Sequence, residues 1–112
     1  MTAIALQLTV RQWATIDATM DNAAHNARDS FEDPEPADSI RETGRQQVPW
    51  VGPDRQWPAM EQVLTMSFRR DQWQFALEQL TADDPIYEKL GDLESLHLGR
   101  DAREAISRQL LP

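Results

Sequence analysis

The segment ALQLTVRQW, residues 5–13, changes from a strand pattern to a helix pattern within nine residues. Its apolar residues alternate with small or polar residues up to Val10, which is the period of a strand with one buried face. From Trp13 onward, apolar residues recur every three or four positions, as on an amphipathic helix. Because Thr9 and Gln12 form a T-x-x-Q capping box, we expect this helix to begin near residue 10.

A second segment, LTMSFRRDQW at residues 64–73, repeats this order of patterns. Alternation up to Phe68 predicts a strand, and the apolar spacing from Trp73 onward predicts a helix. We expect Ser67 or an adjacent residue to cap this helix, with Asp71 in the first turn, where a carboxylate complements the helix dipole.

The two halves of the chain also end alike, because RQQVP at residues 45–49 resembles RQLLP at residues 108–112. One interpretation is a tandem β-α-α duplication with pseudo-twofold symmetry. Its units, residues 1–49 and 60–112, would be joined by a connector rich in proline and tryptophan. The other interpretation is a small α+β domain with two unrelated amphipathic helices, since short matches of this kind also arise by chance.

An acidic segment, DSFEDPEPADS at residues 29–39, precedes a further helix signal. It holds five carboxylates and two prolines in eleven residues, a composition typical of a loop. Ser39 and Glu42 form a capping box, so we expect a helix that begins near residue 40.

The last third of the chain carries more boundary signals. Asp84 followed by Pro85 indicates an N-cap with proline at the first helical position, and Gly91 indicates the end of that helix. Asp101 is the expected cap of a final helix. The stretch LESLHLG, residues 93–99, fits either a helical turn or a short strand.

The chain of 112 residues has the length of a single domain, residues 1–112, and its signals predict an α+β fold with two strands and four to five helices. Two strands alone are marginal in water and expose both edges. Helices of the same monomer could cover the pair, or two monomers could join strand edges. Closed twofold association is the commonest oligomer, which favours a homodimer.

Composition disfavours several classes of function. The net charge of −8 is spread along the chain without a basic patch, so we expect no direct contact with nucleic acid. The absence of cysteine excludes disulfides, thiolate zinc sites and cysteine nucleophiles. The N-terminus lacks a basic signal region and no apolar run reaches about 18 residues, so we expect a cytoplasmic protein without a membrane partner. Ten arginines against one lysine suggest a bacterial or phage genome rich in GC.

One row of side chains resembles a metal site, because Asp17, Asp21, His25 and Asp29 follow one another at i, i+4 spacing. Two carboxylates and an imidazole could hold a divalent ion. The row drifts about 40° per step around the helix, however, and no paired ligand motif occurs elsewhere. A solvated helix flank is the simpler interpretation. No nucleophile, phosphate or dinucleotide motif is present, so we expect a non-enzymatic protein without cofactor or metal.

The connector VPWVGPDRQWP, residues 48–58, places two tryptophans on either side of a turn sequence. The indoles could clamp this loop onto the core. They could also form a platform for a partner, since tryptophan and arginine dominate protein interfaces. Both interpretations are correct if one ring faces the core and the other faces solvent. We therefore predict Trp50, Arg55 and Trp57 as partner-binding residues.

These features predict a small acidic protein-binding module, whose acidic segment at residues 29–38 steers a basic protein partner by charge. Two alternatives remain. One is a metal-dependent activity on the face formed by Asp17, Asp21 and His25. The other is an acidic mimic of nucleic acid that inhibits a DNA-binding protein.

Overall fold

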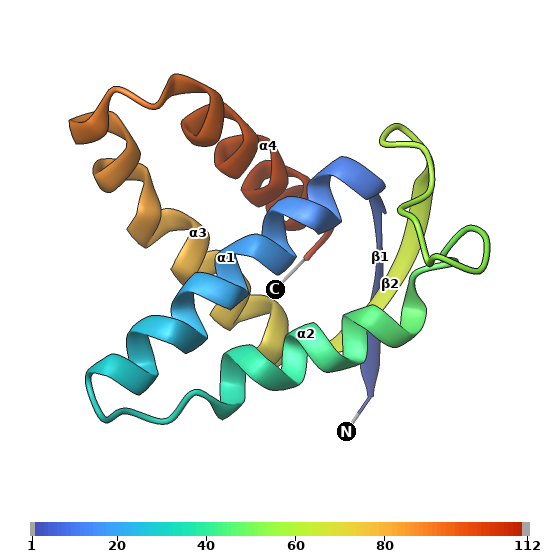
Figure 1. The fold of residues 1–112 in the computed structure, drawn as a ribbon, viewed down its shortest axis with the longest axis horizontal. Coiled ribbons are helices and arrows are strands. Elements are labelled where there is room, and N and C mark those ends of the chain that lie inside the picture. The colour runs from blue at the N-terminus through green and yellow to red at the C-terminus, as the bar shows by residue number, and fades with distance from the viewer. Residues whose placement is uncertain (1, 111–112) are drawn as a thin grey trace.

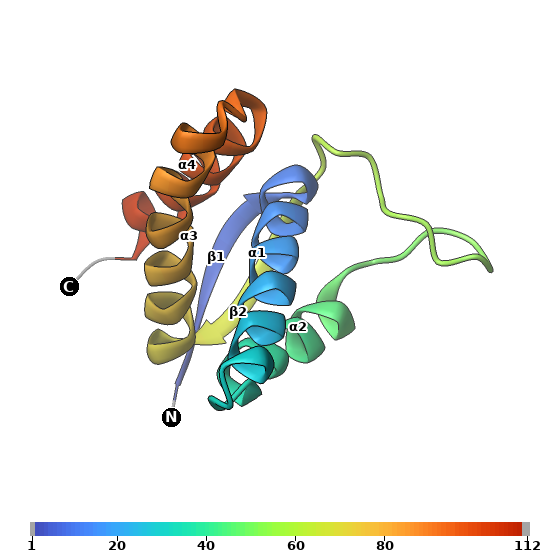
Figure 2. The ribbon, with the colours of Figure 1, turned by 60° about the vertical axis from the view of Figure 1, so that its left-hand side comes forward.

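The computed structural model describes residues 2–110, and twice in this range a strand continues directly into a helix. In chain order the elements are β1 (Ala3–Thr9), α1 (Val10–Asp29), α2 (Glu35–Gln47), β2 (Val63–Arg69), α3 (Arg70–Leu90) and α4 (Leu93–Gln109). The strands pair antiparallel, with Leu6 opposite Met66. The helices cover one face of this sheet (Figures 1 and 2). The predicted α+β domain with two strands and four to five helices is confirmed.

Both junctions between strand and helix follow from local sequence. Thr9 Oγ1 accepts a hydrogen bond from the Gln12 N–H at 3.1 Å, and the Gln12 side chain accepts one from the Thr9 N–H at 2.9 Å. The predicted capping box is therefore confirmed, and α1 begins at residue 10. At the second junction the Gln72 side chain accepts from the Arg69 N–H at 3.0 Å. The N-cap of α3 is thus Arg69, two positions after the predicted Ser67, which lies in β2.

Three aromatic rings occupy the centre of the core. Phe68 of β2 stacks on Trp13 of α1 with the ring centroids 5.5 Å apart, and it meets Trp73 of α3 edge to face at 4.9 Å. The Trp73 indole N–H donates to the carbonyl of Ile4 at 2.9 Å, so its polar atom is satisfied inside the core. Both tryptophans thus attach their helices to the same residue of the sheet.

Helix α2 approaches α1 at a buried glycine. Gly44 lies so close to the Trp13 indole that a β-carbon at this position would overlap the ring. Glycine inside a helix costs about 1 kcal/mol relative to alanine. The close approach of the two helices explains why the chain accepts this cost.

The last residue of the second helix in each half closes one edge of the sheet. Gln47 of α2 accepts from the Ser67 N–H at 2.7 Å and donates to the Ser67 carbonyl at 2.9 Å. Gln109 of α4 binds Gln7 on the other strand in the same way, at 2.8 and 2.7 Å. A homodimer that joins strand edges, as the sequence suggests, would have to displace the amide on the edge it uses.

Several features of the two halves lie sixty positions apart. Strands begin at residues 3 and 63, and the helices that follow them begin at residues 10 and 70. Each edge amide belongs to the last residue of the second helix that follows a strand, Gln47 of α2 and Gln109 of α4. The tandem duplication itself stays a prediction. Pro112, which ends the second sequence match, lies outside the described residues.

The predicted start of the second helix is wrong, because α2 begins at Glu35 and not near residue 40. The Asp33 carboxylate accepts from the Glu35 N–H at 3.0 Å, and Pro36 is tolerated because the first turn needs no N–H there. Ser39 lies inside the helix, where its hydroxyl donates to the Pro36 carbonyl at 3.1 Å. Only residues 30–34 of the acidic segment remain a connection between helices.

The predicted helix start at Pro85 is also wrong, because α3 continues through this proline. Tertiary contacts stabilise the helix here. The Asp84 side chain is only 12% exposed and lies 2.8 Å from Arg103 and 3.5 Å from Arg100, both on α4. The helix then ends at Gly91 as predicted, with a left-handed φ of 71°.

Helix α4 begins earlier than predicted. Its N-cap is Asp92, whose carboxylate accepts from the Ser95 N–H at 3.1 Å, and hydrogen bonds from Ser95 lower the pKa of Asp92. Residues 93–99 are therefore helical. Asp101, the predicted cap, lies inside α4 and accepts from the Gln12 side chain at 3.1 Å.

Replacing Gly44 tests the contact between α1 and α2. We expect Gly44→Ala to lower the free energy of unfolding by about 1–3 kcal/mol, because the added methyl group overlaps a fixed indole. Gly99→Ala is a matched control, since a β-carbon at this buried helical position would meet only Asp84 Oδ1, at 3.8 Å. It should leave stability unchanged or raise it by up to about 1 kcal/mol. Urea unfolding followed by tryptophan fluorescence measures both, and equal effects would contradict the packing argument.

Candidate functional site

Residues 50–57 form a short hairpin, which we term the tryptophan hairpin. Val51 and Gln56 exchange two main-chain hydrogen bonds of 2.8 and 2.9 Å. Gly52 and Arg55 adopt left-handed backbone conformations, with φ of 74° and 53°. Glycine adopts this conformation freely, whereas at Arg55 it costs about 1 kcal/mol. The turn is therefore a defined structure and not an irregular loop.

The three predicted partner-binding residues lie together on this hairpin. The ring centroids of Trp50 and Trp57 are 4.5 Å apart, and the guanidinium carbon of Arg55 lies 5.8 Å from the Trp50 centroid. The Trp50 indole N–H donates to the carbonyl of Arg45 at 2.9 Å. Both rings are half-buried against the core, so neither is fully inward or outward. The indoles anchor the hairpin and remain partly accessible.

The acidic segment is not the continuous loop that the sequence suggests for residues 29–38. Its last four residues belong to α2. Asp38 pairs with Arg28, and Asp29 lies 3.3 Å from the imidazole of His25. The segment also lies at the opposite end of the molecule from the tryptophan hairpin (Figures 1 and 2). Steering by this segment would therefore not act beside the hairpin.

The row of acidic residues on α1 is occupied by ion pairs. Arg41 of α2 lies 3.2 Å from Asp17 and 3.0 Å from Asp21. These contacts relieve the repulsion between like charges at i, i+4 and attach α2 to α1. Within residues 2–110 no three acidic or histidine side chains gather in a way that could hold a metal ion.

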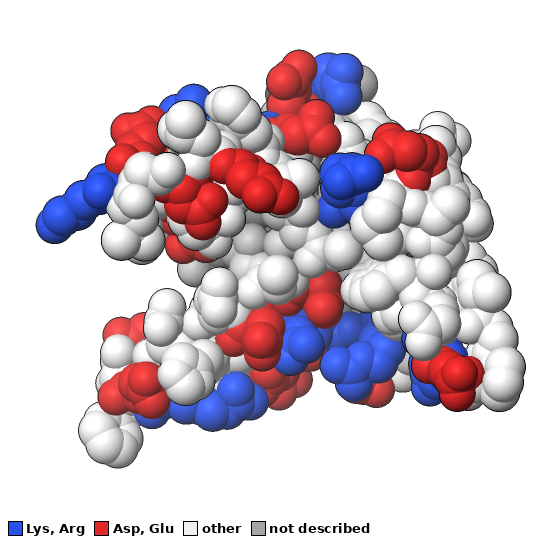
Figure 3. All heavy atoms as spheres, turned by 45° about the horizontal axis from the view of Figure 1, so that its top comes forward, with Lys and Arg blue, Asp and Glu red and all other residues white. Residues whose placement is uncertain are grey.

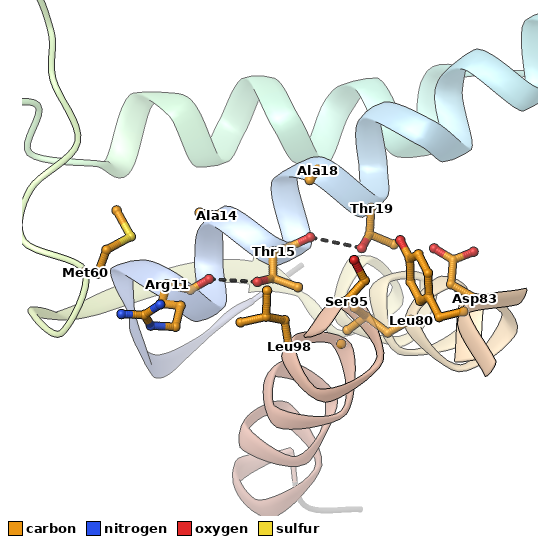
Figure 4. Close-up of a pocket in the computed structure, with 12 residues that line it drawn as sticks. Arg11, Ala14, Thr15, Ala18, Thr19, Met60, Leu80, Asp83, Ser95 and Leu98 are labelled. Carbon is orange, nitrogen blue, oxygen red and sulfur yellow. Dashed lines mark hydrogen bonds between the residues drawn. The ribbon is translucent and has the colours of Figure 1, made fainter. Parts of the chain in front are cut away.

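A cleft opens between α1 on one side and α3 with α4 on the other, which we term the helix cleft (Figure 3). Its volume of about 340 Å³ falls within the range of small-molecule sites. Small and apolar side chains from the three helices line it, among them Ala14, Thr15, Ala18, Leu80 and Leu98 (Figure 4). The hydroxyl of Thr15 donates to the carbonyl of Arg11 at 2.9 Å, so this donor is already satisfied within α1.

Two charged residues stand at opposite ends of the helix cleft, Arg11 and Asp83 (Figure 4). Arg11 pairs with Glu61 at 2.8 Å. Asp83 is half-buried, and its carboxylate has no hydrogen bond or ion pair within the described part of the chain. Burial raises the pKa of Asp83, and the neighbouring Asp84 raises it further. Burial and the charge of Asp83 likewise raise the pKa of Tyr87, which also lines the cleft.

Sequence reasoning missed the helix cleft, because its walls come from helices that are far apart in the chain. One signal was present: Ala14 and Ala18 lie one turn apart on α1, where larger side chains would fill the space. Phe31 was also missed. Its side chain is 99% exposed, and its backbone has a left-handed φ of 58°, which is uncommon for an aromatic residue.

Two neighbouring carboxylates should respond oppositely to neutralisation. Asp84→Asn should lower the free energy of unfolding by about 1–3 kcal/mol, because it removes the negative charge that pairs with Arg100 and Arg103 of α4. Asp83→Asn should raise stability, because it removes a partly buried charge that is repelled by the adjacent Asp84 and has no cation beside it. The folded-state pKa of Asp83 is raised, so its ionisation destabilises the native protein above that pKa.

The gain from Asp83→Asn should therefore be present at pH 7 and disappear as the pH falls toward 3.8, the ordinary value for aspartate. Urea unfolding at a series of pH values measures it. A loss of stability for Asp83→Asn at pH 7 equal to that for Asp84→Asn would show that the two carboxylates have the same role.

Comparisons with known proteins add no further assignment of either surface. No protein-family model, no curated protein and no solved structure matches this chain. No helix in residues 2–110 is long and apolar enough to cross a membrane. The interpretation of the tryptophan hairpin and the helix cleft therefore depends on their own geometry.

Proposed function

We propose that this protein is a small protein-binding module that presents the tryptophan hairpin to a protein partner. One observation carries the proposal: Trp50, Trp57 and Arg55 form a contiguous, partly exposed cluster on a hairpin that projects from the helices (Figure 2). Tryptophan and arginine are the residue types most enriched among interface positions that dominate binding energy.

The hairpin is ordered before any partner arrives, which favours binding. Two main-chain hydrogen bonds close it, and the Trp50 indole is tied to the carbonyl of Arg45. The guanidinium of Arg55 lies beside the Trp50 ring, so its conformation is also restricted. Ordering a free side chain on binding costs about 0.5–1.5 kcal/mol, and much of this cost is already met here.

The exposed tip indicates the chemistry of the partner. Val51 is 54% exposed, and Arg55 and Asp54 are also exposed. A complementary surface would offer an apolar patch for the indoles and Val51, with polar groups at its rim. The net charge of −8 favours approach to a basic protein at long range.

The structure offers less support for the nucleic-acid mimic. A mimic needs carboxylates aligned on one face without interruption by cations. Basic side chains instead lie among the acidic ones on both lobes of the face in Figure 3, and several acidic side chains are paired, among them Asp17 with Arg41 and Glu88 with Arg100.

Affinity capture from a lysate of the native organism tests the proposal. The test variant carries Val51→Asp and Arg55→Asn, which change the exposed tip but keep both tryptophan anchors. Asparagine tolerates the left-handed backbone at position 55. We expect the partner of the wild-type protein to be lost, with affinity reduced at least tenfold, and crosslinks from the partner to map to residues 50–57.

Phe31→Asn is the matched control, because it removes a fully exposed aromatic ring at a left-handed position far from the hairpin. Circular dichroism and urea unfolding must show that all variants fold. Capture that survives the tip variant but not Phe31→Asn would refute the hairpin as the recognition element.

A further inference from the structure

We propose that the helix cleft binds a small organic ammonium compound, with its apolar body between α1 and α4 and its cationic group at Asp83. This site is separate from the tryptophan hairpin and does not depend on the function proposed for it. The cleft joins three helices that differ widely in sequence position, so its shape follows from the tertiary fold (Figure 4).

The walls of the cleft suit an apolar ligand body. Ala14 and Ala18 leave a shallow face on α1, and Leu80 and Leu98 form the opposite wall. Thr15 and Thr19 bond to main-chain carbonyls of their own helix at 2.9 Å, so their hydroxyls are already satisfied. A ligand body without hydrogen-bonding groups therefore leaves no donor of these two residues unpaired.

The charged residues of the cleft favour a ligand with a positive charge. Arg11 at one end is neutralised by Glu61. Asp83 at the other end has no cation beside it within the described residues, and its neighbour Asp84 is engaged by Arg100 and Arg103. A cation at Asp83 would gain a charged hydrogen bond in a partly desolvated site.

The Tyr87 ring adds a second attraction for the same group. It lines the cleft one helical turn after Asp83, and its hydroxyl is neutral at pH 7, since burial raises a pKa whose ordinary value is already 10.0. An aromatic face within about 6 Å of an ammonium group stabilises it. The volume of about 340 Å³ matches a small molecule, which is why we favour this occupant over a protein segment.

The test uses phenethylammonium as the probe, with phenethyl alcohol and hydrocinnamate as neutral and anionic compounds of the same shape. Two-dimensional amide NMR of the full chain maps the contact. We expect phenethylammonium to shift residues 14–19, 80–87 and 95–99 with a Kd on the order of 1 mM or tighter. The alcohol should bind at least tenfold more weakly, and the anion should bind least.

Two variants test whether the ammonium group binds at Asp83 and whether the apolar body lies in the cleft. Asp83→Asn should reduce the affinity for phenethylammonium about tenfold and remove the preference over the alcohol, and Ala18→Leu should weaken both by filling the cleft. Glu78→Gln is the matched control, because it removes one exposed carboxylate of α3 outside the cleft. It should leave the affinities unchanged.

Four outcomes would overturn the proposal. They are no binding of phenethylammonium, equal binding of ammonium and alcohol, an equal loss in Glu78→Gln, or shifts centred on the indoles of Trp50 and Trp57. Perturbation of the same cleft amides by a protein partner alone would instead make the cleft part of a protein interface. None of these results depends on whether the hairpin binds its partner.

Discussion

The position of one indole ring determines how the rest of the protein is arranged. Trp13 is buried between Phe68 of β2 and the glycine surface of α2 at Gly44. Burial of a tryptophan side chain contributes about 4–6 kcal/mol, which exceeds the cost of about 1 kcal/mol for glycine within a helix. Because α2 is fixed by this contact, Gln47 reaches the strand edge and the chain enters the tryptophan hairpin at a defined point.

The sequence predicts those elements whose signals are local. The switch from alternation to helical spacing at Thr9 and Val10 is complete within a few residues, so the strands and the start of α1 are confirmed. The prediction of a helix start at Pro85 is wrong because the preference of proline for a first turn is a weak local rule. Here the buried Asp84 and its two arginine partners on α4 hold the helix through the proline.

The two candidate surfaces also differ in how far local sequence predicts them. The cluster of Trp50, Arg55 and Trp57 could be predicted from the sequence, because all three residues lie within eight consecutive positions of the chain. The helix cleft could not, since α1, α3 and α4 meet only after folding. The two surfaces are nevertheless linked: Met60, three residues after the hairpin, lines the cleft, and its carbonyl accepts from the Arg11 N–H at 3.0 Å. Met60 thus lies between the two surfaces in the chain and contributes to the wall of the cleft.

The two glutamine amides at the sheet edges bear on how this protein behaves when it is concentrated. A sheet of two strands is the kind of surface on which cross-β stacking begins, because each outer strand offers main-chain groups in register. At Gln7 and at Ser67, an incoming chain would have to displace a glutamine amide that already makes two hydrogen bonds with the main chain. Gln47 and Gln109 thus occupy one main-chain pairing position on each outer edge without a third strand.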